Sequence, residues 1–83
     1  MQVEHLGAGK FQAGLRNGVE NFIWRFTPDT LQPALKDVVD TAGLELISYD
    51  QAAILLQGMR YAVIDYESAP VHFEQVLRRA GVA

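Results

Sequence analysis

Two stretches near the N-terminus alternate apolar and polar residues, which is the spacing of half-buried β-strands. They are KFQAGLR at residues 10–16 and VENFIWRF at residues 19–26. In the second stretch Ile23 falls on one face of the strand, and three aromatic residues fall on the other. These three are Phe22, Trp24 and Phe26. We expect Trp24 to belong to the core rather than to a ligand-binding platform.

The pair Asn17-Gly18 lies between the two stretches and predicts a tight hairpin. Both residue types tolerate the positive φ that a type I′ turn requires, so this turn type is expected. Further upstream, the sequence Gly-Ala-Gly at residues 7–9 is typical of a turn. Residues 1–9 carry little other pattern and are expected to be flexible.

Helical spacing begins in the segment TPDTLQPALKDVVDTAG, residues 27–43. Asp29 or Thr30 would cap its start, and Pro33 is tolerated in the first turn because those amides lack helical partners. Gly43 is expected to end the helix in a left-handed conformation. One apolar stripe follows from the spacing: Leu31, Leu35, Val38, Val39 and Ala42.

Three short strands are predicted after this helix, at residues 44–49, 52–57 and 61–66. The middle strand has an alternative, since Asp50 could also cap a short helix over the sequence QAAILLQ. An apolar run of this length does not distinguish a buried strand from a helix by its period. The strand is the preferred interpretation.

A second helix is predicted after Ser68, with Pro70 in its first turn and Gly81 at its end. Its apolar positions follow the helical period: Phe73, Val76, Leu77 and Ala80. The two predicted helices align when Gly43 is placed on Gly81, and each follows a predicted strand. This repeat favours two strand–helix units in one sheet.

The predicted fold is therefore α+β, with one domain over residues 1–83. An antiparallel sheet of four to five strands would carry two helices on one face, in the order ββαβββα. This is a ferredoxin-like (split βαβ) arrangement whose usual last strand is missing after Gly81.

The strand–helix–strand pattern resembles that of small heavy-metal-associated domains, which also have a glycine after each helix. Those domains hold their metal on a Cys-x-x-Cys pair at the start of the first helix. Here the matching loop at residues 27–30 reads Thr-Pro-Asp-Thr and contains no sulfur. The resemblance is one of architecture, and it implies no metal site or function for this chain.

Composition narrows the possible functions. The 83 residues contain no cysteine, which excludes disulfides and thiolate metal sites. Seven Lys and Arg are scattered among ten Asp and Glu, so no basic patch for nucleic acid is expected. The longest apolar run, Ala52 to Leu56, is far shorter than the ~20 residues of a membrane helix. With no signal-peptide pattern at the start, a cytoplasmic location is expected.

Three residues are weak candidates for a metal or acid–base site: His72, Asp65 and Glu67. A helical ligand pair needs a spacing of three or four residues, and His72 has no acid or second histidine at those positions. Asp65 and Glu67 would share one face of a strand, where solvated acids are common. We therefore expect no enzyme activity, no metal and no cofactor.

Apolar side chains exceed what two helices can cover on one face of the predicted sheet. The surplus predicts an interface that contains Ile23, Ile47, Tyr49, Leu55, Tyr61 and Val63. A large apolar patch is rarely left in water, so a second copy of the chain, or another protein, is expected to cover it. The hypothesis is a non-enzymatic interaction or regulatory domain that self-associates through its sheet face or edge. The alternative is a regulatory domain that binds a small ligand or metal ion between subunits.

Overall fold

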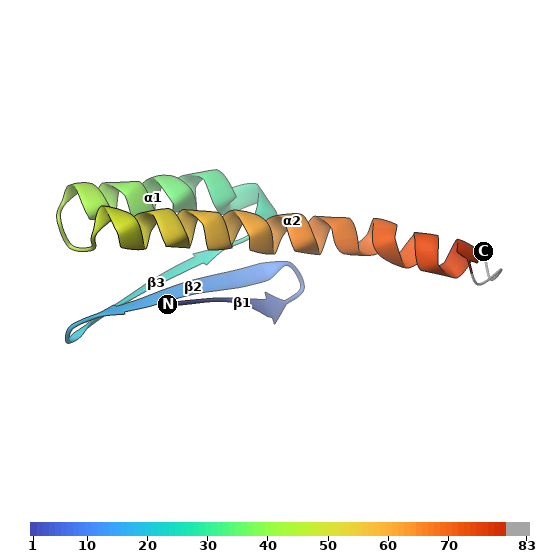
Figure 1. The fold of residues 1–83 in the computed structure, drawn as a ribbon, viewed down its shortest axis with the longest axis horizontal. Helices are drawn as coiled ribbons and strands as arrows, with labels where there is room; N and C mark the ends of the chain where they lie inside the picture. The colour runs from blue at the N-terminus through green and yellow to red at the C-terminus, as the bar shows by residue number, and fades with distance from the viewer. Residues whose placement is uncertain (80–83) are drawn as a thin grey trace.

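The computed structural model describes the backbone of residues 1–79 and the side chains of residues 1–68. Its elements, in chain order, are the strands β1 (Gln2–Gly7), β2 (Lys10–Asn17) and β3 (Glu20–Phe26), a short 3₁₀ turn η1 (Pro28–Thr30), and the helices α1 (Leu31–Gly43) and α2 (Tyr49–Arg79). The strands form one antiparallel sheet in the order β1-β2-β3, and both helices lie on one face of it (Figure 1). The fold is α+β, as predicted.

The hairpin between β2 and β3 forms where it was predicted, with a shifted turn. Asn17 pairs with Glu20, so the two loop residues are Gly18 and Val19. Gly18 has a φ of 68°, and Val19 is not among the residues with positive φ. A positive φ at the first loop residue alone is the pattern of a type II′ turn rather than the predicted type I′.

Strand β1 forms in the segment that was expected to be flexible. Gln2 to His5 pair with β2, and the predicted turn at residues 7–9 has positive φ at all three positions. The imidazole of His5 stacks on the ring of Phe11, with 4.7 Å between the ring centroids. The centroid of the Tyr66 ring, on α2, lies 5.0 Å from that of His5. These aromatic contacts hold β1 against β2 and α2.

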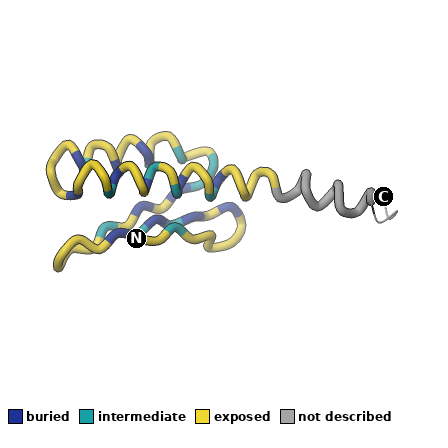
Figure 2. Tube along the Cα trace, in the orientation of Figure 1, coloured by how far each residue is buried: buried dark blue, intermediate teal, exposed yellow. Residues whose placement is uncertain are grey.

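Sheet register decides which side chains enter the core. Phe11 pairs with Phe26, and Ala13 pairs with Trp24, which places all four side chains on the face that the helices cover. The core runs through β2, β3, both helices and the loop between them (Figure 2) and consists of Phe11, Ala13, Leu15, Trp24, Phe26, Leu35, Val38, Ala42, Ile47, Ala52, Leu55, Met59 and Val63. The prediction that Trp24 is a core residue is confirmed.

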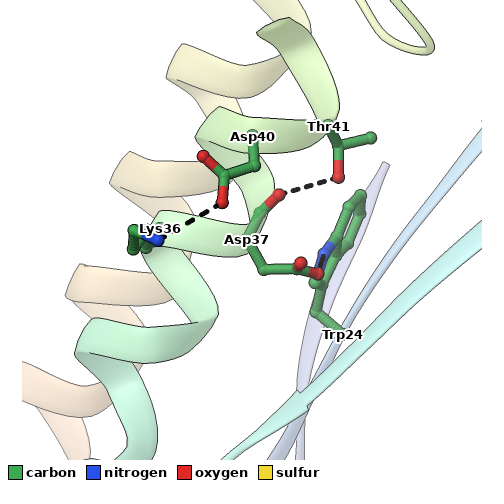
Figure 3. A network of polar contacts seen from close by, with 5 residues as sticks. All are labelled: Trp24, Lys36, Asp37, Asp40 and Thr41. Carbon is green, nitrogen blue, oxygen red and sulfur yellow. Dashed lines mark hydrogen bonds and ion pairs between the residues drawn. The ribbon is translucent and has the colours of Figure 1, made fainter. Parts of the chain in front are cut away.

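Helix α1 is held to the sheet by a polar contact as well as by its apolar stripe. The indole Nε1 of Trp24 donates a hydrogen bond of 2.8 Å to Oδ2 of Asp37 (Figure 3). On the same helix Thr41 Oγ1 donates to the main-chain oxygen of Asp37 at 2.7 Å. The Lys36–Asp40 ion pair, at 3.7 Å, lies on the exposed side.

The ends of α1 differ in detail from the prediction. Thr27 and Thr30 form a capping box around η1, and the Thr30 side chain makes no cap bond to α1 itself. At the other end the positive φ, 61°, belongs to Glu45 and not to Gly43. The amides of Glu45 and of the next residue bond back into the last turn of the helix, so Glu45 occupies the left-handed position of a Schellman motif.

The strands predicted at residues 44–49, 52–57 and 61–66 are wrong. Residues 49–79 form the single helix α2, so within residues 1–79 the sheet has three strands and the ferredoxin-like order does not form. The helix predicted to begin after Ser68 is instead the C-terminal part of α2, which passes through Pro70 and extends beyond the sheet (Figure 1).

Local chemistry explains why α2 begins at residue 49. The Oγ atom of Ser48 accepts from the Gln51 amide at 3.0 Å, and Gln51 Oε1 accepts from the Ser48 amide at 2.9 Å. This capping box satisfies amides at the start of the helix. The buried positions then follow the helical period rather than strand alternation: Ala52, Leu55, Met59 and Val63. Within the described part of the chain, no helix is both long and apolar enough to cross a bilayer.

Candidate interaction surface on helix α2

The open face of the sheet is polar, contrary to the apolar face that the sequence predicted. Gln12 of the central strand bonds through its side chain to Glu4 of β1 at 3.4 Å, and it accepts from Arg25 of β3 at 3.3 Å. Ile23 is an exposed apolar residue on this face. A polar ladder across all three strands is an ordinary solvated sheet face.

The six predicted interface residues separate into two groups. Ile47, Leu55 and Val63 are buried in the core and are not exposed for binding. The exposed group consists of Ile23, Tyr49 and Tyr61. The three buried residues were placed on an open face because the segments that carry them were assigned to strands, and helix α2 turns two of them toward the core.

A second stripe of residues runs along the side of α2 that faces away from the core. We call it the outer stripe and define it as Ile54, Gln57, Tyr61, Ile64 and Ser68. The spacing of three, four, three and four residues keeps these positions on one helix face, about half a turn from Leu55, Met59 and Val63. Ile54, Tyr61 and Ile64 are 58%, 57% and 58% exposed.

The flank of the outer stripe is hollowed. A depression of about 510 Å³ lies along α2, lined by Ala53, Leu56, Gln57, Arg60, Tyr61 and Ile64. Arg60 is exposed, and it forms no ion pair with any described side chain. The surface thus combines large apolar side chains with a cation that has no partner of its own within residues 1–68.

The metal candidates are not brought together. Asp65 and Glu67 are both exposed on α2, and a spacing of two residues directs them to different sides of a helix. His72 lies outside the residues whose side chains are described. In the part of the chain whose side chains are described, no three His, Cys, Asp or Glu residues are grouped as metal ligands.

A second hollow lies where the β2–β3 hairpin meets the loop between the helices. Its volume is about 430 Å³, and its lining residues are Asn17, Ala42, Glu45, Ile47, Ser48, Tyr49 and Gln51. Asn17 donates through Nδ2 to the main-chain oxygen of Leu46 at 2.8 Å, which fixes the hairpin to the loop. Ser48 and Gln51 bond to each other's amides in the capping box.

Sequence analysis missed Ile54, Gln57 and Ile64 as surface candidates. The heptad spacing that runs from Ile54 to Ile64 was present in the sequence. It was overlooked because the same segments were assigned to two strands, in which Ile64 alternates with the predicted interface residue Val63 and therefore falls on the covered face. The outer stripe can be recognised only when residues 54–68 are assigned to one helix.

Comparisons of the chain with protein-family models, with curated proteins and with solved structures each found no match. No family is assigned, and no ligand or partner is carried over from a relative.

Proposed function

We propose that the chain is a non-enzymatic interaction domain that self-associates through the outer stripe of α2. The observation that carries the proposal is the exposure of Ile54, Tyr61 and Ile64 along one face of a helix whose other face is already buried. Burial of such side chains against a partner helix removes apolar area from water. A cytoplasmic location remains an expectation from the sequence.

The outer stripe replaces the sheet face as the proposed contact. The sheet face carries the polar ladder of Glu4, Gln12 and Arg25, which would lose its hydration in an interface. A helix face with residues spaced by three and four positions suits packing against a second helix of the same kind. A second copy of the chain supplies that helix directly, by two-fold symmetry.

The association should be weak. A standard protein interface uses roughly 20–30 residues on each side, and the outer stripe offers far fewer. We therefore expect a reversible dimer in the micromolar range or above. Sedimentation equilibrium over a series from micromolar to submillimolar concentration measures its dissociation constant.

Two isoleucines provide a matched test of the surface. Ile64 on the outer stripe and Ile23 on the open sheet face are 58% and 57% exposed. Ile64→Asp should abolish the dimer while far-UV circular dichroism stays that of the wild type, and Ile23→Asp should leave the dimer intact. Loss of the dimer only in Ile23→Asp would move the contact to the sheet face. A wild-type monomer at every concentration would refute self-association.

Binding of a small ligand is the second candidate function. The hollow beside the α1–α2 loop supports it, because the exposed side chains of Glu45 and Tyr49 lie on its rim. A thermal-shift screen with metal ions, amino acids and nucleotides tests it, since a ligand that binds the folded state raises the melting temperature. Absence of any shift across the screen would count against this candidate.

A further inference from the structure

We propose that two copies of α2 pair in antiparallel orientation, with Arg60 of each copy against Glu67 of the other. The inference rests on the proposed self-association and specifies its geometry. Tyr61 of one copy would then lie opposite Ile64 of the second copy, and two-fold symmetry repeats both contacts.

Arg60 and Glu67 lie on the same flank of the outer stripe, because seven residues make nearly two full helical turns. Both side chains are exposed. At three or four residues from either of them the sequence places no charged residue, and neither forms an ion pair with a side chain of residues 1–68. Each is therefore available to a charge on another molecule.

The outer stripe has one flank with Arg60 and Glu67 and another with Asp65. In an antiparallel pair each flank lies beside the same flank of the second copy, whereas in a parallel pair it lies beside the other flank. In the antiparallel pair Arg60 meets Glu67, and Asp65 on the other flank meets Gly58, so no like charges oppose each other. In a parallel pair Arg60 would meet Asp65 instead. The antiparallel pair is favoured because the positive end of each helix dipole then lies beside the negative end of the other.

Charge complementarity also explains how copies of an acidic chain can meet. Each chain carries a formal net charge of −3, so two copies repel at long range. Two Arg60–Glu67 contacts placed beside the apolar residues of the stripe oppose that repulsion locally. A second copy is thus an occupant whose charges fit this surface.

Charge reversal tests the orientation. Arg60→Glu alone and Glu67→Arg alone each place like charges together twice in an antiparallel dimer, so each should weaken self-association on the order of tenfold at low salt. An equimolar mixture of the two variants pairs opposite charges at both contacts. The mixture should therefore form a heterodimer about as strong as the wild-type dimer, detected when a tag on one variant retains the untagged other.

The outcomes separate this inference from the proposed function. If Glu67→Arg alone has no effect, Arg60→Glu alone weakens the dimer, and the mixed dimer is weaker than that of Glu67→Arg alone, the pairing is parallel through Asp65. If neither reversal changes a wild-type dimer, the orientation is refuted and self-association stands. If the wild type is a monomer throughout, both are refuted. Far-UV circular dichroism of each variant, with Arg60→Ala as a milder change, confirms that the helix is retained.

Discussion

The indole Nε1 of Trp24 lies 2.8 Å from Oδ2 of Asp37, and this hydrogen bond joins the edge strand β3 to helix α1. We expect loss of the bond in Asp37→Ala to lower the free energy of unfolding by about 1 kcal/mol, because the indole N–H then loses its protein acceptor. Urea denaturation followed by the fluorescence of Trp24 measures the change.

Asp40→Ala is the matched control, since it removes an acid from the same helix and makes the same gain in helix propensity. Both side chains of its ion pair with Lys36 are exposed, and such pairs contribute about 0–1 kcal/mol to the free energy of unfolding. The prediction concerns the difference between the two variants. Equal stabilities of Asp37→Ala and Asp40→Ala would show that the indole bond contributes nothing measurable.

The left-handed residue at the end of α1 can be identified by substitutions at Glu45 and Gly43. Glu45 has a φ of 61°, a conformation that costs a residue with a side chain about 1–2 kcal/mol and costs glycine almost nothing. Glu45→Gly should therefore raise the free energy of unfolding by about 1 kcal/mol, in thermal unfolding monitored at 222 nm.

Gly43→Ala provides the opposite test. Gly43 has no positive φ, and a methyl group there would meet nothing within 4 Å. We expect this variant to be neutral or up to about 1 kcal/mol more stable, because alanine favours a helix. A marked loss of stability in Gly43→Ala would instead support the left-handed cap at Gly43 that the sequence predicted.

The capping box at the start of α2 predicts coupling between two side chains. Ser48→Ala should destabilise the protein by about 1 kcal/mol, since an amide of the first turn loses its acceptor. Gln51→Ala should cost less, and the double variant should cost less than the sum of the two if they act as one unit. Strict additivity in this cycle would contradict the reciprocal bonds. Ser68→Ala, inside the same helix, is the control, and because Ser68 belongs to the outer stripe all variants are measured at a concentration low enough to keep the chain monomeric.

Val63 and Ile64 distinguish the helix from the predicted strand. In the helix Val63 is in the core and Ile64 is 58% exposed, whereas the strand would have put Ile64 on the covered face. We expect Val63→Ala to cost about 2 kcal/mol and Ile64→Ala to cost no more than about 0.5 kcal/mol. The measurement is chemical denaturation at a concentration low enough to keep the chain monomeric. The reverse order would favour the strand.

Local patterns predicted the parts of the fold that local chemistry decides. The β2–β3 hairpin follows from a glycine turn between two alternating stretches, and α1 follows from its apolar stripe. The inner position of Trp24 follows from strand alternation. These features need only neighbouring residues, so one sequence is enough to find them.

The remaining elements depend on distant contacts or on a cue that was overlooked. Strand β1 has few inward apolar residues, and it is held by its pairing with β2, by the packing of Val3 against the core and by the aromatic contacts of His5. For α2, the apolar runs fit a strand as well as a helix, and the sequence Ser-Tyr-Asp-Gln at residues 48–51 carried the deciding capping box. The misplaced interface residues Leu55 and Val63 follow from that one error.

The contact between β1 and Tyr66 has a consequence for how the protein is made. Residues of β1 leave the ribosome before α2, and Tyr66, whose ring covers His5 and Phe11, leaves it about sixty residues after His5. At typical translation rates of roughly 5–20 residues per second, that interval lasts several seconds. During this interval α2 does not yet cover the aromatic residues on the inner face of the sheet. The nascent chain is therefore most exposed to chaperones and to misassembly before α2 is complete.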